Sequence, residues 1–118
     1  MSAPVWIAVG LVGGGASVAR YLLGDSVAAA TRTAFPLGTL AVNVSGALAL
    51  GLLVGLRVHG TAFVLLGTAL LGTFTTFSTW MLESERLARS QRVWLAAINL
   101  VASLVAGVGA IALGRLVG

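Results

Sequence analysis

Four long apolar stretches, separated by short polar links, dominate the chain. They cover about residues 4–23, 37–56, 61–80 and 94–113. A helix needs about 20 apolar residues to cross the hydrocarbon core of a bilayer, and each stretch has about that length. The pattern therefore predicts four transmembrane helices, with links too short to hold a second domain. We expect residues 1–118 to form a single transmembrane domain.

Composition and charge agree with a membrane location. Of the 118 residues, 58% are hydrophobic and 8% are charged, which is more apolar than an ordinary soluble domain. All the basic residues that give the net charge of +4 are arginines. They are more numerous in the first and third links than at the other face, so the positive-inside rule favours these links in the cytoplasm. The charge indicates a multi-pass protein of the cell membrane, surrounded by lipid, and no nucleic-acid partner is expected.

Groups that carry catalysis are few in this sequence. There is no cysteine, the single histidine is His59 in the second link, and the acidic residues Asp25, Glu83 and Glu85 are expected in links. No acid, base or nucleophile then meets another inside a span, so an enzyme is not expected. A small proton-coupled exporter of cationic drugs would share the length and the four spans, but it needs a buried carboxylate.

Glycines recur at the spacing that lets helices approach each other closely. Gly10 with Gly14, and Gly51 with Gly55, have the GxxxG spacing that is typical of helix interfaces in membranes. Helix packing explains most of the 16 glycines, so a membrane assembly protein without transport stays open as an alternative. Gly72 differs from the others, because it stands near the middle of the third stretch and directly precedes a polar run.

The polar run in the third stretch lies at membrane depth. Its five hydroxyl side chains are those of Thr73, Thr75, Thr76, Ser78 and Thr79. Lipid offers a broken backbone no hydrogen bonds, so such a run is tolerated only where it is buried in protein or lines a cavity. If the helix unwinds near the preceding glycine, main-chain carbonyls lose their partners and form a pocket that suits a monovalent cation. The alternative is that the hydroxyls only bond back to the preceding turn.

The second and fourth spans also carry polar residues at membrane depth. Asn43 lies in the second span, and Asn99 lies in the fourth with Ser103 one helical turn beyond it. Either asparagine alone more often joins helices, but together they predict a track of N–H and O–H donors, which stabilise anions. Arg20, near the end of the first span, would add a positive field, or else its guanidinium extends to the membrane interface.

Three blocks of sequence resemble the signature segments of a known family. They are residues 14–21 (GGASVARY), 36–46 (PLGTLAVNVSG) and 72–80 (GTFTTFSTW). In this order they resemble the small bacterial fluoride channels of the CrcB or Fluc family, and the length and the four-span layout agree across the whole chain. The resemblance implies an all-α membrane protein with a break in the third of four transmembrane helices, assembled as an antiparallel, dual-topology dimer.

The resemblance also implies a function. Channels of this family export toxic fluoride passively through two pores, and a structural sodium ion lies on the dimer axis, held by main-chain carbonyls. Gly72 and Thr75 match the residues that supply those carbonyls. Some relatives are pairs of fixed, opposite orientation, so the expected partner is a second copy of this chain or a paralogue of opposite orientation.

A fluoride path follows from the same resemblance. An aromatic ring has a positive edge that can face an anion, and Phe77 and Trp80 match two aromatic positions, although the family more often has a second phenylalanine at the latter. In span four the family commonly shows a tyrosine followed by serines, where this chain has Asn99, Ser103 and Gly107. The residues expected along the path are Asn43, Thr76, Phe77, Ser78, Thr79, Trp80, Asn99 and Ser103, with Arg20 supplying positive charge.

Overall fold

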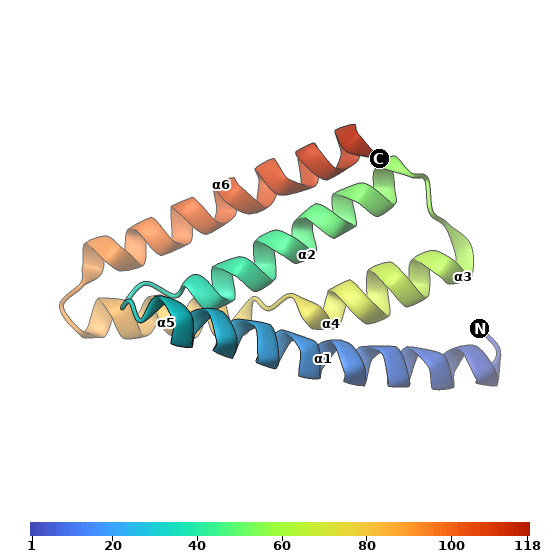
Figure 1. Ribbon diagram of the computed structural model, residues 1–118, viewed down its shortest axis with the longest axis horizontal. Coiled ribbons are helices and arrows are strands. Elements are labelled where there is room, and N and C mark those ends of the chain that lie inside the picture. The colour runs from blue at the N-terminus through green and yellow to red at the C-terminus, as the bar shows by residue number, and fades with distance from the viewer.

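In a computed structural model of residues 1–118, four long apolar helices lie beside one another and the third is broken (Figure 1). Each has the length and hydropathy of a membrane span. The prediction of four helices with a break in the third is confirmed. The elements are α1 (Ala3–Thr31), α2 (Leu37–Gly55), a third helix assembled from α3 (Gly60–Phe63), η1 (Val64–Leu71), α4 (Gly72–Phe74) and α5 (Ser78–Arg89), and α6 (Val93–Val117).

The helices run beyond the apolar stretches. α1 continues to Thr31, and α5 continues to Arg89. Asp25, Glu83 and Glu85 therefore lie within helices, and the prediction that they fall in links is wrong. The physical reason is that a helix, once nucleated, propagates through any residues of good helix propensity, and both extensions are rich in alanine, leucine, glutamate or arginine.

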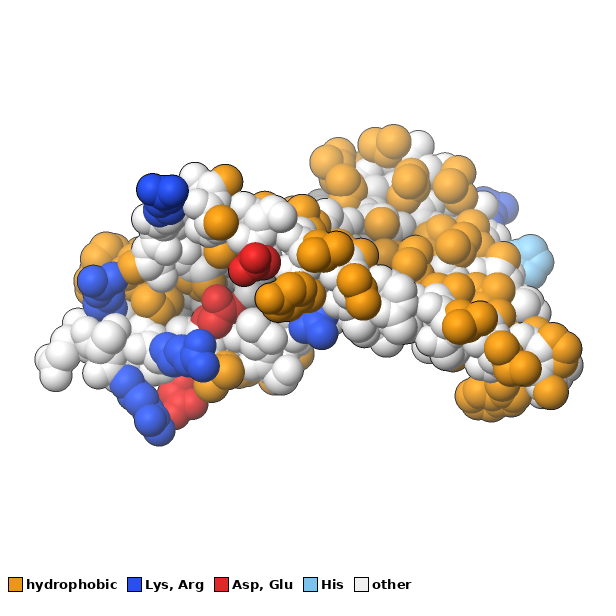
Figure 2. All heavy atoms as spheres, turned by 60° about the horizontal axis from the view of Figure 1, so that its bottom comes forward, with side chains coloured by type: hydrophobic (Ala, Val, Ile, Leu, Met, Phe, Trp, Pro, Cys, Tyr) orange, Lys and Arg blue, Asp and Glu red, His pale blue; other side chains and the backbone are white.

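Charge is concentrated at one end of the bundle. Both chain termini and the α2–α3 link lie at one end, and the α1–α2 and α5–α6 links lie at the other (Figure 1). Figure 2 shows the acidic and most of the basic side chains gathered toward that second end, with apolar side chains covering much of the rest of this face. Large apolar side chains such as Leu11, Val105 and Val108 are exposed. A surface this apolar is one that lipid or another subunit covers.

Glycines let α2 and α6 pack main chain against main chain. Gly51 of α2 faces the carbonyl of Ile111, and Gly114 of α6 faces the main chain of α2. A Cβ atom at either glycine would overlap the neighbouring backbone, so this approach requires glycine. In contrast, Gly10 and Gly14 of α1 have nothing within 4 Å of an added Cβ. Only one of the two GxxxG pairs therefore packs against another helix of this chain.

The third helix changes its winding before it breaks. η1 is π-helical, and the N–H of Gly72 still bonds to the carbonyl of Gly67, five residues earlier. Gly72 itself is helical, with φ −63° and ψ −33°. Thr75 then turns to extended backbone, with φ −78° and ψ 160°. The break thus falls at residues 75–77, a little beyond the glycine where the sequence places it. π-helical turns are rare and are frequently found at functional sites.

Candidate functional site

Asn43 of α2 holds the broken segment with both ends of its amide. Its Nδ2 donates to the carbonyl of Thr76, and its Oδ1 accepts from the N–H of Thr76, each at 2.8 Å. In an unbroken α-helix this N–H would bond to the carbonyl of Gly72. The side chain of Asn43 thus replaces the missing helical partner and fastens the break to α2.

The break leaves several carbonyl oxygens without hydrogen bonds, and two of these belong to residues that line a cavity. The last carbonyl with a helical partner before the break is that of Leu71, which accepts both the N–H of Thr75 at 3.1 Å and its hydroxyl at 3.0 Å. The carbonyls of Gly72 and Thr75 accept no hydrogen bond within the chain. Both residues line a cavity of about 350 Å³. Free carbonyls give its wall negative partial charge, and no carboxylate lines it.

The five hydroxyls of the polar run divide into two groups. Those of Thr73 and Thr75 bond back to main-chain carbonyls one turn earlier, as the alternative interpretation expects. The hydroxyl of Thr76 lies 3.2 Å from that of Thr79 and accepts the N–H of Thr79, in the first turn of α5, at 3.3 Å. Ser78 is exposed. Of the five hydroxyls, only those of Thr76, Ser78 and Thr79 make no bond to the preceding turn, so only these three can face a solute.

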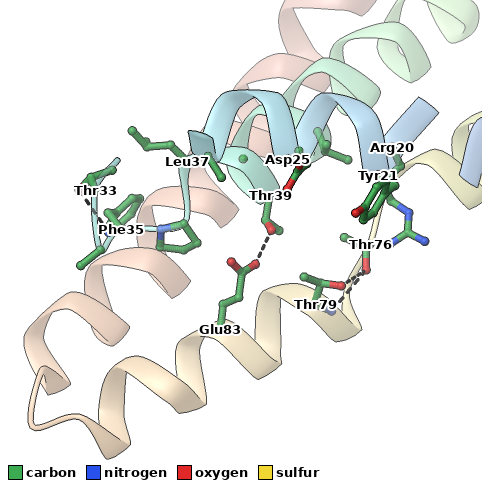
Figure 3. A pocket seen from close by; sticks show the side chains of 16 residues that line it. Arg20, Tyr21, Asp25, Thr33, Phe35, Leu37, Thr39, Thr76, Thr79 and Glu83 are labelled. Carbon is green, nitrogen blue, oxygen red and sulfur yellow. Dashed lines mark hydrogen bonds between the residues drawn. The ribbon is translucent and has the colours of Figure 1, made fainter. Parts of the chain in front are cut away.

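A second cavity, of about 390 Å³, lies beside the break (Figure 3). Arg20, Thr76 and Thr79 line it, so a guanidinium and the hydroxyls of the break share one space. The Nε of Arg20 is enclosed and makes no hydrogen bond within the chain. Farther along the wall, the hydroxyl of Thr39 donates to the carboxylate of Glu83. The cavity therefore holds the guanidinium of Arg20 next to the break, and the carboxylates of Asp25 and Glu83 line it as well.

The two aromatic side chains after the break meet edge to face. The ring centroids of Phe77 and Trp80 are 5.6 Å apart, and the ring planes make an angle of 83°. Both residues line the first cavity. Phe77 is 68% exposed in a single subunit. Lipid or another polypeptide would cover a ring this exposed.

The polar residues of the fourth helix lie apart from both cavities. Asn99 is 1% exposed. Its Nδ2 donates to Ser84 Oγ at 2.8 Å, and its Oδ1 accepts from Ser103 Oγ at 3.2 Å. Neither Asn99 nor Ser103 lines either cavity in the single subunit, so their place on the predicted path stays a prediction. Ser84 was missed from the sequence, although it follows Trp80 by one helical turn and so shares its face.

The chain is similar to known proteins over nearly its whole length. Residues 7–115 match the family described as "CrcB-like protein, Camphor Resistance (CrcB)". The chain is 48% identical over 118 residues to the "Fluoride-specific ion channel FluC 1" of Rubrobacter xylanophilus, covering 98% of this chain and 95% of that protein. It is 47% identical over 111 residues to the "Fluoride-specific ion channel FluC 2" of Mycolicibacterium paratuberculosis, covering 94% of this chain and 91% of that one. The chain therefore belongs to the CrcB family, which confirms the resemblance.

Proposed function

We propose that this protein is a fluoride-specific ion channel that lowers cytoplasmic fluoride by passive export. The observation that carries the proposal is the break at residues 75–77, fastened by Asn43 and flanked by two aromatic rings, in a chain of the CrcB family. Fluoride is small and strongly hydrated. A path for it must replace its water with short hydrogen bonds and stay only moderately attractive, so that the ion can leave.

The groups around the break suit an anion. α5 begins there, so the positive end of its helix dipole lies inside the bundle. The N–H of Phe77 makes no hydrogen bond within the chain, and the ring edges of Phe77 and Trp80 carry positive partial charge. Arg20 adds a full positive charge close to the break, in a cavity that the carboxylates of Asp25 and Glu83 also line. These groups would attract fluoride, with Thr76, Ser78 and Thr79 supplying hydroxyl donors.

The free carbonyls of the break suit a structural sodium ion that is not transported. Main-chain oxygens bind hard cations, and a site without carboxylates favours a monovalent one, because Ca²⁺ and Mg²⁺ usually recruit acidic side chains. Gly72 and Thr75 offer two carbonyls from one subunit, which is too few to surround an ion. A second subunit of opposite orientation would supply two more and would cover Phe77. That subunit is a second copy of this chain or a paralogue.

The direct test is fluoride efflux from liposomes that hold only this polypeptide. A fluoride electrode should record release well above that of protein-free liposomes, and a chloride electrode should record almost none, because a narrow path excludes the larger halide. Chloride release at the rate of fluoride would refute the assignment. Efflux that appears only after a paralogue is added would support the heterodimer.

The sodium proposal predicts an ion-dependent stability. Protein purified throughout in N-methyl-D-glucamine should melt at a lower temperature than protein in sodium. Binding to the folded state alone stabilises it by about 3 kcal/mol at a hundredfold excess over Kd. Thermal unfolding in detergent, at matched ionic strength, measures this difference. Equal melting temperatures in the two salts would count against a sodium site at the break.

A further inference from the structure

A closed set of hydrogen bonds joins Trp80 to α6. The indole Nε1–H donates to the main-chain carbonyl of Asn99 at 3.2 Å. The amide of Asn99 donates to Ser84 Oγ at 2.8 Å, and this hydroxyl donates to the main-chain carbonyl of Trp80 at 2.8 Å. The tryptophan is thus held at its backbone and at the far edge of its ring, and both attachments lead to the same residue of α6.

This set is shielded from its surroundings. Asn99 is 1% exposed and Ser84 is 6% exposed, so neither can exchange its partner for water. A buried donor that loses its acceptor is costly, and networks of this kind hold side chains in one arrangement. The ring that they hold is the one that meets Phe77 at 83°.

The arrangement depends on a tryptophan. The indole N–H is a donor, and a phenylalanine ring at this position has none. A phenylalanine could keep an edge contact with Phe77, but its ring would have no attachment to α6. The hydrogen bond from Trp80 to Asn99 therefore links the aromatic pair of this chain to a residue that lies outside both cavities.

We propose that Asn99 and Ser84 are positioning residues that fix the indole of Trp80 against Phe77 and so set the width of the ion path. The proposal rests on the proposed fluoride channel. It assigns to Asn99 a role between two helices, rather than a place on the path itself. Selectivity between fluoride and larger halides then depends on two side chains that do not touch the ion.

The transport test compares variants in liposomes. Asn99→Leu keeps the size of the side chain and the main-chain acceptor of the indole but removes the donor to Ser84 Oγ, and Ser84→Ala removes the donor to the carbonyl of Trp80. Each variant breaks a buried hydrogen bond, so each should lower the fluoride-over-chloride selectivity about tenfold. In a Trp80→Phe background the same changes should alter selectivity by less than about threefold, because coupled sites are not additive. Val101→Leu on the exposed side of α6 is the matched control. Effects that simply add in the double variants would overturn the proposal.

A second test measures how accessible the indole ring of Trp80 is, and it needs no transport assay. In protein carrying Trp6→Phe and Trp94→Phe, Trp80 is the only tryptophan left of three. Asn99→Leu and Ser84→Ala should increase acrylamide quenching of its fluorescence, and the control should not. If Asn99→Leu does not fold, Ser84→Ala carries the test alone. Unchanged quenching in the folded variants refutes the positioning role, whereas an unmodified protein that passes no fluoride refutes only the proposed function.

Discussion

Replacing Asn43 with leucine should abolish fluoride efflux. The change keeps the size of the side chain but removes both hydrogen bonds to the backbone of Thr76. Both main-chain groups of Thr76 lose their partner at a part-buried place, where the cost is at most the about 1–3 kcal/mol of a fully buried group. The break is then no longer anchored to α2, and efflux should fall at least a hundredfold. The measurement is fluoride release from liposomes containing equal amounts of protein.

The control for this variant lies on the same helix. Ser45→Ala removes a hydroxyl that bonds back to the carbonyl of Ala41 at 2.7 Å, so efflux should stay near that of the unmodified protein. Asn43→Asp keeps an acceptor for the N–H of Thr76 but loses the donor and adds negative charge, so it too should fail. An Asn43→Leu protein that folds and transports normally would show that the break needs no anchor.

Phe77→Ile should also abolish fluoride efflux, and it should leave the fold intact. Isoleucine has no positive ring edge to present to an anion. Phe77 is 68% exposed and meets Trp80 edge to face, and an aromatic pair of this kind contributes only about 0.5–1.5 kcal/mol. We expect efflux to fall to the level of protein-free liposomes, while circular dichroism and elution volume stay unchanged.

A phenylalanine three residues earlier offers a matched comparison. Phe74 ends α4 and lies near Gly46 of α2, and it lines neither cavity beside the break. Phe74→Ile should therefore keep measurable fluoride efflux, with a loss of thermal stability from poorer packing. Equal loss of efflux in Phe74→Ile and Phe77→Ile would mean that the aromatic edge at position 77 has no special role.

Much of the architecture could be predicted from local pattern. Apolar stretches of about 20 residues predict spans because lipid accepts little else, and glycine followed by hydroxyls marked the break. Helix ends could not be placed this way. Glu83, expected in a link, lies in α5, which continues past the apolar stretch, so the distinction between a channel and a proton-coupled exporter needs more than the place of the acidic residues. Membership of the CrcB family now distinguishes the two classes.

The partners within the site depend on tertiary contacts. Asn43 was recognisable as a polar residue at depth, but nothing local indicates that it bonds Thr76, 33 residues away. Ser84 was missed for a similar reason, since its hydrogen bond to Asn99 crosses from α5 to α6. The sequence indicated which residue types matter, and packing decided which of them meet.

The π-helical winding of η1 determines the direction in which the side chains of the following segment face. Its eight residues, Val64–Leu71, turn less per residue than an α-helix does. Adding or deleting one residue there would rotate the downstream segment by somewhat less than the about 100° that one residue turns in an α-helix. Thr76 would then swing away from Asn43, and the two rings would face a different neighbour. Changes in the length of this apolar stretch should therefore be tolerated far less than changes in its side chains.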